Sequence, residues 1–131
     1  MRLLLLALSC IVALAGNAQK TFESKEGDTT YVMQEYYVIY LVAGENRAQD
    51  SLETARIQAE HMAHLGKMAD AGYLSLVGPF GDESDIRGMC IYNTATLEEA
   101  MELASADPAV KAGRLKVEGR PWWCAKGGVL K

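Results

Sequence analysis

One short run, YYVIYLV at residues 36–42, constrains the fold of this chain more than any other feature. Its β-branched and aromatic residues predict a strand, in which successive side chains point to opposite faces of a sheet. Both faces of this strand are apolar, because the alternating side chains are Tyr36, Val38, Tyr40 and Val42 on one face and Tyr37, Ile39 and Leu41 on the other. A sheet built on this strand therefore needs a covering layer on each side.

A long helix is predicted after this strand. Asp50 and Glu53 have the capping-box spacing that begins a helix, and Gly72 is a typical stop, so we expect the helix to run from residue 51 to about Ala71. At about 100° per residue, His61 falls within the apolar stripe of this helix and His64 at its edge. The other residues of the stripe are Ala55, Ile57, Met62, Leu65, Met68 and Ala69.

A hairpin is predicted next. Residues 73–80 (YLSLVGPF) and 89–93 (MCIYN) have strand composition, and the acidic segment GDESDIRG between them has the composition of a turn. We therefore expect two antiparallel strands that follow the long helix directly.

A second helix and a last strand complete the pattern. Thr96 with Glu99 is another capping box and predicts a helix over residues 97–105. Asp107 before a proline predicts a short N-capped turn, and residues 114–123 predict the last strand. The order βαββαβ indicates an α+β, ferredoxin-like domain: a four-stranded antiparallel sheet with two helices on one face.

The second face of the sheet needs a cover that these helices do not provide. An antiparallel sheet normally shows polar residues toward water, yet the first strand is apolar on both faces. A second copy of the chain is the simplest source of another layer, so we expect a homodimer.

The N-terminus has the pattern of a secretory signal peptide. Residues 1–18 place one arginine ahead of a short apolar run and end in small residues, so we expect cleavage after Ala18 and export to the periplasm or the medium. A lipoprotein at Cys10 is a less favoured alternative. We expect a flexible polar leader over residues 19–30 and a single domain over residues 31–131, with no membrane insertion after cleavage.

Charge and cysteine content limit the partners. Without residues 1–18 the chain keeps 12 of its 13 Lys and Arg residues and all 17 Asp and Glu residues, a formal charge of −5. This charge argues against nucleic acid and anionic membranes as partners. In an oxidising compartment Cys90 and Cys124 could form a disulfide, but two unpaired thiols are favoured because one lies in a strand and the other in the C-terminal tail.

Several motifs together resemble one known family. They are His61 eleven residues before the glycine of AGYLSLVGPF, the segment LEEAMELASADPAVKAG, and RPWW near the C-terminus. On these motifs, residues 36–123 are similar to the YCII-related family of the dimeric α/β-barrel superfamily. GPFGD, DIRG and NRAQDS further resemble an exported subgroup.

The resemblance implies a barrel formed by two sheets across a dimer and a cleft that holds a histidine and an aspartate proposed as catalytic. These residues correspond here to His61 and to Asp107 of the ADP motif, whereas His64 matches no family position. The resemblance also implies reactions on small cyclic molecules, such as dehydrochlorination of a chlorinated hydroxyquinol, lactone isomerisation or oxidation of aromatic compounds.

Each candidate residue also has an ordinary structural explanation. His61 could be a hydrogen-bonded core residue, and Asp107 has the position of a helix N-cap, which leaves it free for catalysis only if one oxygen is not used by the cap. Asp82 is a reserve partner for His61 and otherwise a solvated turn residue. Arg87 could bind an anionic substrate group or pair with the acidic turn, and Tyr40 belongs to an aromatic set that could line a pocket or form an interface.

Metals and organic cofactors are not indicated by the motifs. His61 and His64 are neighbours on a helix, but a zinc site needs three or four ligands, and neither HExxH nor CxxC spacing occurs. GPFG lacks the spacing of a phosphate-binding loop.

We therefore expect an exported enzyme-like domain in which His61, oriented by Asp107 or less favourably by Asp82, moves a proton in an isomerisation or elimination of a small cyclic or aromatic molecule. The alternative is a non-catalytic dimeric module for ligand binding or assembly. The distance from the His61 ring to the nearest carboxylate discriminates between the two.

Overall fold

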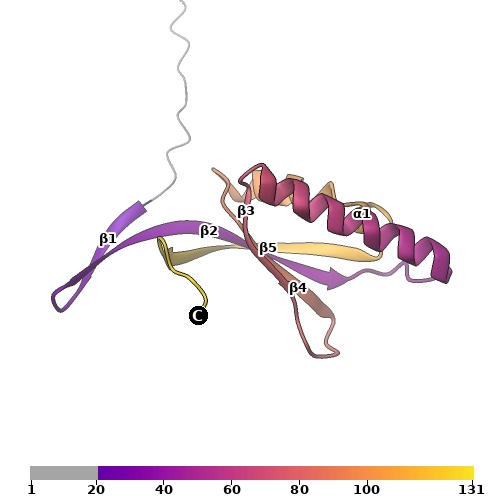
Figure 1. Cartoon of the computed structure of the whole chain (residues 1–131), viewed down its shortest axis with the longest axis horizontal. Coiled ribbons are helices and arrows are strands. Elements are labelled where there is room, and N and C mark those ends of the chain that lie inside the picture. Colours follow the sequence, from indigo (N-terminus) through magenta and orange to yellow (C-terminus); the bar gives the residue numbers. More distant parts are fainter. Residues whose placement is uncertain (1–20) are drawn as a thin grey trace, which may run out of the picture.

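The computed structural model describes residues 21–131, and the predicted signal peptide lies outside the described residues. Five strands form one sheet and three helices accompany it (Figure 1). The elements are β1 (Thr21–Glu26), β2 (Thr29–Ala43), α1 (Ser51–Asp70), β3 (Leu74–Pro79), β4 (Ile86–Tyr92), α2 (Leu97–Ser105), α3 (Pro108–Lys111) and β5 (Leu115–Ala125). No helix within residues 21–131 combines the length and apolar character of a membrane span.

β2 is the central strand, as its two apolar faces require. Along one edge it pairs antiparallel with β5, from Met33 opposite Ala125 to Ala43 opposite Leu115. Along the other edge it pairs first with β1 and then with β4, and β3 pairs with the far edge of β4. The order β5-β2-β4-β3, with helices after β2 and β4, is that of a ferredoxin-like domain. The predicted α+β fold is confirmed.

The N-terminal hairpin corrects one prediction. The expected flexible leader over residues 19–30 is wrong for its described part, because residues 21–26 form β1 and pair with β2 in unbroken register. Gly27, with φ of 59°, makes the turn, and Phe22 packs against Trp123 at 4.9 Å between ring centroids. The hairpin projects away from the helices (Figure 1) and is mostly exposed, so its sequence carries no apolar alternation. The domain thus begins before the predicted Tyr31.

α1 begins and ends where its caps predict. The Asp50 side chain accepts a hydrogen bond from the backbone N–H of Glu53 at 2.8 Å, and Gly72 adopts a positive φ of 82° just after the C-cap. The buried stripe is narrower than predicted: it comprises Ile57, His61, Leu65 and Met68. Ala55, Met62 and Ala69 are exposed, because the sheet below covers only the centre of the helix face.

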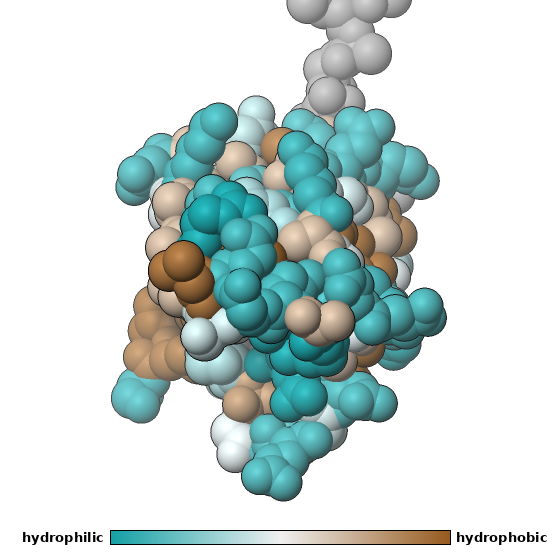
Figure 2. Space-filling model, turned by 90° about the vertical axis from the view of Figure 1, so that its right-hand side faces the viewer, coloured by the Kyte–Doolittle hydropathy of each residue, from teal (hydrophilic) through white to brown (hydrophobic). Residues whose placement is uncertain are grey.

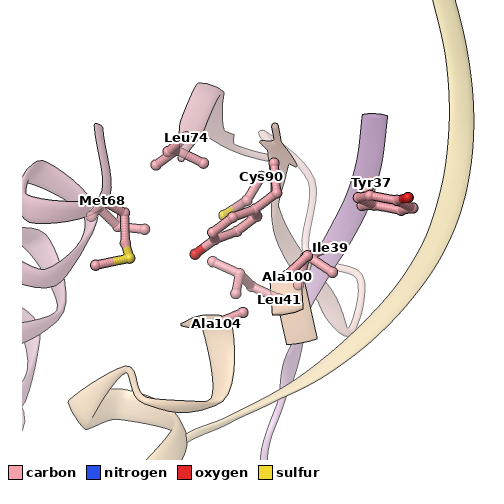
Figure 3. Close-up of a cluster of buried hydrophobic side chains, with 10 residues drawn as sticks. Tyr37, Ile39, Leu41, Met68, Leu74, Cys90, Ala100 and Ala104 are labelled. Atoms are coloured by element: carbon pink, nitrogen blue, oxygen red, sulfur yellow. The ribbon is translucent and has the colours of Figure 1, made fainter. Parts of the chain in front are cut away.

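α1 and α2 cover one face of the sheet and enclose the hydrophobic core (Figure 1). Figure 3 shows Met68 of α1 and Ala100 and Ala104 of α2 directed toward side chains of the strands. The strand residues of this core are Tyr37, Ile39, Leu41, Leu74, Cys90 and Tyr92. The core therefore uses the odd-numbered face of the first predicted strand, as alternation requires.

The opposite face of the sheet is apolar and partly open. Tyr36, Ile91 and Trp122 line a hollow of about 490 Å³ there, together with Leu76 and the C-terminal tail. Leu76 and Trp122 are 42% and 43% exposed. The end of the molecule where α1 begins, in contrast, has a mainly hydrophilic surface with a smaller hydrophobic area along one side (Figure 2).

Cys90 and Cys124, the cysteines within residues 21–131, are unpaired thiols in the structure. Cys90 belongs to the core beneath the helices, whereas Cys124 pairs in register with Gln34 and lines the hollow on the opposite face. The sheet separates the two thiols.

Candidate functional site

His61 is placed at the centre of the buried face of α1. Only 8% of the residue is exposed, and its Nδ1 lies 2.6 Å from Oδ2 of Asp107. An ionised carboxylate only accepts hydrogen bonds, so this contact assigns the ring proton to Nδ1. Nε2, the other ring nitrogen, has no hydrogen-bond partner among residues 21–131, and it carries the lone pair when the imidazole is neutral.

Asp107 has two functions at once. Its Oδ1 accepts the backbone N–H of Ala109 at 2.8 Å and so caps α3, while its Oδ2 faces His61. With 2% of the residue exposed, both oxygens are held by protein donors rather than water. Asp107 can therefore serve both functions, because the N-cap uses one carboxylate oxygen and leaves the other for His61.

A cavity of about 420 Å³ opens beside His61. It lies between α1 and the ends of β3 and β4 that are linked by the acidic turn, and its size suits a small organic molecule. Much of the wall is apolar, and the apolar lining includes Leu41, Ile57, Leu65, Val77 and Leu115. The imidazole therefore contacts both a buried carboxylate and an open space.

Arg87 also lines this cavity. Its side chain has no ion pair or hydrogen bond with any residue of the described chain, so the expected alternative, pairing with the acidic turn, is not realised. Asp82 is exposed in that turn and accepts a hydrogen bond from the Ser84 hydroxyl at 3.0 Å. The carboxylate that meets His61 is thus Asp107 and not the reserve candidate Asp82.

Tyr40 does not line the cavity with His61. It alternates with Ile39 and Leu41, which belong to the helix-covered core, so its ring points to the other face of the sheet. There the Arg120 guanidinium lies 5.7 Å from the ring centroid. Strand alternation therefore corrects one of the two predictions for Tyr40: its side chain does not line the His61 cavity, while its role in an interface stays a prediction.

His64 has a different environment from His61. Its Nε2 contacts the backbone carbonyl of Leu103 at 3.1 Å, which ties α1 to the end of α2. Within residues 21–131, no three His, Cys, Asp or Glu side chains gather as metal ligands would. The two histidines that are three positions apart in the sequence therefore serve separate contacts.

The Cys90 thiol lies near this site but in its protonated form. Burial raises the pKa of Cys90 to about 12, and the negative charge of Asp107 adds to the effect. Burial also raises the pKa of Tyr92, and the charges of Cys90 and Asp107 raise it further by smaller amounts. These groups hold their protons at neutral pH, so neither a thiolate nor a phenolate is available as a base beside Asp107.

Two cavity residues were not anticipated from the sequence. Arg47 follows β2 and Arg114 precedes β5, and both line the cavity with His61. Each lies in a polar connection, where an arginine is usually a solvated surface residue. The only available signal was their position beside the ends of two strands that the ferredoxin-like order makes neighbours.

A solved structure of 5-chloro-2-hydroxyhydroquinone dehydrochlorinase from Burkholderia phenoliruptrix, in complex with 2,5-dihydroxybenzoquinone, is similar to the chain at 22% sequence identity. The match covers 66% of this chain and 92% of that protein, with a TM-score of 0.49. No curated protein matches the chain.

The family comparison covers most of the domain. The model of the YCII-related domain matches residues 36–122, which are 87 of the 131 residues. The match begins inside β2 and ends inside β5, so it spans α1 with His61 and the start of α3 with Asp107, while the β1 hairpin precedes it. The chain therefore belongs to the YCII-related domain family.

Proposed function

We propose that this chain is an acid/base enzyme in which His61 transfers a proton and Asp107 orients the ring. The observation that carries this proposal is the 2.6 Å contact between His61 Nδ1 and Asp107 Oδ2, combined with the position of the ring on the wall of a cavity. A histidine that served packing alone would not need a buried carboxylate behind it and an open space in front of it.

The proposed step follows from the tautomer. The Nε2 lone pair takes a proton from a carbon of the substrate, and the C–H electron pair moves into the adjacent unsaturated group. The imidazolium that forms is stabilised by Asp107, which accepts from Nδ1. Return of the proton to another carbon completes an isomerisation, while departure of a leaving group completes an elimination. Small cyclic or aromatic compounds are the substrates we propose, given the apolar wall of the cavity.

Deuterium exchange tests this proposal before the substrate is known. Cyclic carbon acids, such as lactones and cyclic ketones, are incubated with the protein in D₂O, and incorporation at carbon is followed by NMR or mass spectrometry. His61→Gln should abolish incorporation above the buffer rate. His64→Gln is the matched control, because His64 lies on the same helix and, within the described residues, its side chain bonds to the Leu103 carbonyl instead of to a carboxylate. Incorporation that survives His61→Gln would refute the proposal, and ligand binding without any exchange would favour the non-catalytic module.

We infer that a second copy of the chain covers the open face of the sheet. The support is the apolar hollow of about 490 Å³ lined by Tyr36, Leu76, Ile91 and Trp122, of which Leu76 and Trp122 are largely exposed. Exposed apolar surface of this kind is typical of a protein–protein interface. Light scattering of the mature chain at micromolar concentration should give the mass of a dimer, and a monomer would contradict the inference.

We propose that the domain acts after export, because residues 1–18 have the order of a signal peptide. Expression with the complete N-terminus, followed by cell fractionation and N-terminal sequencing, should place the protein outside the cytoplasm with Gln19 as its first residue. An intact Met1 in the cytoplasmic fraction would reject the proposal.

A further inference from the structure

The charged side chains that line the His61 cavity are all arginines. Of the fifteen residues of the described chain that line it, three are arginines, Arg47, Arg87 and Arg114, and none is aspartate or glutamate. This composition runs against the chain as a whole, which has a net charge of −4. The excess of positive charge therefore belongs to this cavity and is not a property of the surface in general.

The three arginines are not neutralised by the protein. The ion pairs within residues 21–131 are those of Arg56 with Glu53 and Glu60 and that of His61 with Asp107. None of the cavity arginines has a carboxylate within ion-pair distance in that part of the chain. The nearby acid Asp107 is already occupied by His61 and by the N–H of Ala109.

Two of the arginines are held in place by neutral groups. Arg47 Nη1 donates to the backbone oxygen of Arg114 at 2.9 Å. Arg114 Nη1 contacts Gln49 Oε1 at 3.0 Å and Thr54 Oγ1 at 3.4 Å. A guanidinium has five N–H donors, so each of these side chains keeps donors and its full charge for another partner.

Arg87 differs because its side chain makes no hydrogen bond or ion pair within the described chain. It extends from β4, a strand whose neighbouring Gly88 is buried and also lines the cavity. Its planar donor group matches a carboxylate with two parallel hydrogen bonds.

We propose that the ligand of this cavity is a small organic anion with a carboxylate or an equally acidic group. Arg87 binds the charged group, Arg47 and Arg114 supply additional positive charge, and the apolar wall contacts the rest of the molecule. This inference rests on the proposed function, since it takes the His61 cavity as the substrate site. It narrows the substrate class from small cyclic molecules to small acids.

Paired probes that differ only in charge test the inference. Acetate with acetamide, benzoate with benzamide, and 2-naphthoate with 2-naphthamide offer three sizes, and each amide replaces the carboxylate with a neutral group of nearly the same shape. Affinities are measured by calorimetric titration of the full mature chain. In the size that fits, we expect the acid to bind at least tenfold more tightly than its amide, the effect of about one charge-assisted hydrogen bond.

Variants then assign the preference to Arg87. Arg87→Gln should weaken acid binding about tenfold and leave amide binding unchanged, and Arg87→Lys should fall between wild type and Arg87→Gln because it keeps the charge without the two-pronged geometry. Arg120→Gln is the matched control: it removes the same charge from the opposite face of the sheet, where Arg120 lies over Tyr40. The acid preference should persist in this control.

The outcomes separate this inference from the proposed function. If no acid binds wild type more tightly than its amide, or if Arg87→Gln retains the full preference, the anion inference is overturned and the acid/base proposal is unaffected. If deuterium incorporation survives His61→Gln while the acid preference depends on Arg87, the acid/base proposal fails and the anion site stands.

Discussion

Replacement of Asp107 by alanine and by asparagine separates the two functions of this side chain. Asp107→Ala removes the cap of α3 and the partner of His61 together. A lost N-cap costs about 1 kcal/mol and a lost hydrogen bond to a charged group about 1.5–3 kcal/mol. We therefore expect the free energy of unfolding to fall by about 3 kcal/mol, measured by urea denaturation.

Asp107→Asn should cost only about 1 kcal/mol, because the amide oxygen can still accept the Ala109 N–H and the charge assistance alone is lost. The amide nitrogen then faces His61 and donates to Nδ1, which moves the ring proton to Nε2. The base would be disabled in a protein that remains folded.

NMR of ¹⁵N-labelled imidazole checks this tautomer directly. The wild type should show a protonated Nδ1 for His61 and Asp107→Asn a protonated Nε2, while His64 stays the same in both. A protonated Nδ1 in the asparagine variant, or equal stability of the alanine and asparagine variants, would refute the reasoning.

Three further predictions follow from the packing. Gly44→Ala should destabilise the fold by about 2 kcal/mol or more, because a Cβ there would collide with the backbone of Gly113 and Arg114. Gly66→Ala, in an open helix position, should instead stabilise the fold by about 0.5–1 kcal/mol. Equal effects of the two variants in urea denaturation would contradict this prediction. Burial raises the pKa of Cys90 to about 12 from an ordinary 9.0, so the stability that its thiol contributes is complete below pH 9 and is lost as pH rises toward 12. Iodoacetamide at pH 8 should therefore leave Cys90 unlabelled until urea is added, and labelling of Cys90 in the folded protein would contradict this. Trp122→Glu should shift the dimer we propose to monomer in light scattering, and Phe22→Glu, at a similarly exposed aromatic on the N-terminal hairpin, should not.

The core of the fold could be predicted because its signals are local. Asp50, Thr96 and Asp107 each accept the backbone hydrogen bond that their cap positions predict, and α1 and α2 begin where expected. β1 was not predicted, because an exposed hairpin needs no apolar side chains. The register of β1 also depends on the length of β2 rather than on its own sequence. The buried face of α1 was predicted too wide, since periodicity gives the direction of a stripe but not the area of the surface that covers it.

The site was predicted as far as residue type and helix face allow. His61 could be placed on a buried face, but the choice of Asp107 over Asp82 depends on how α3 packs against α1, which no local pattern contains. Arg47 and Arg114 could not be assigned to the cavity for the same reason, because their contacts with each other and with Gln49 join segments more than 60 residues apart.

The contact between His61 and Asp107 joins residues 46 positions apart, one on α1 and one at the start of α3. Neither half of the domain contains both groups, so a nascent or truncated chain that ends before α3 would present His61 as an ordinary exposed imidazole. In the mechanism we propose, His61 can act as a base only after the last fifth of the sequence, which begins at Asp107, has packed against α1. In that mechanism, packing of α3 against α1 completes the site, and the contact between His61 and Asp107 shows whether this packing has taken place.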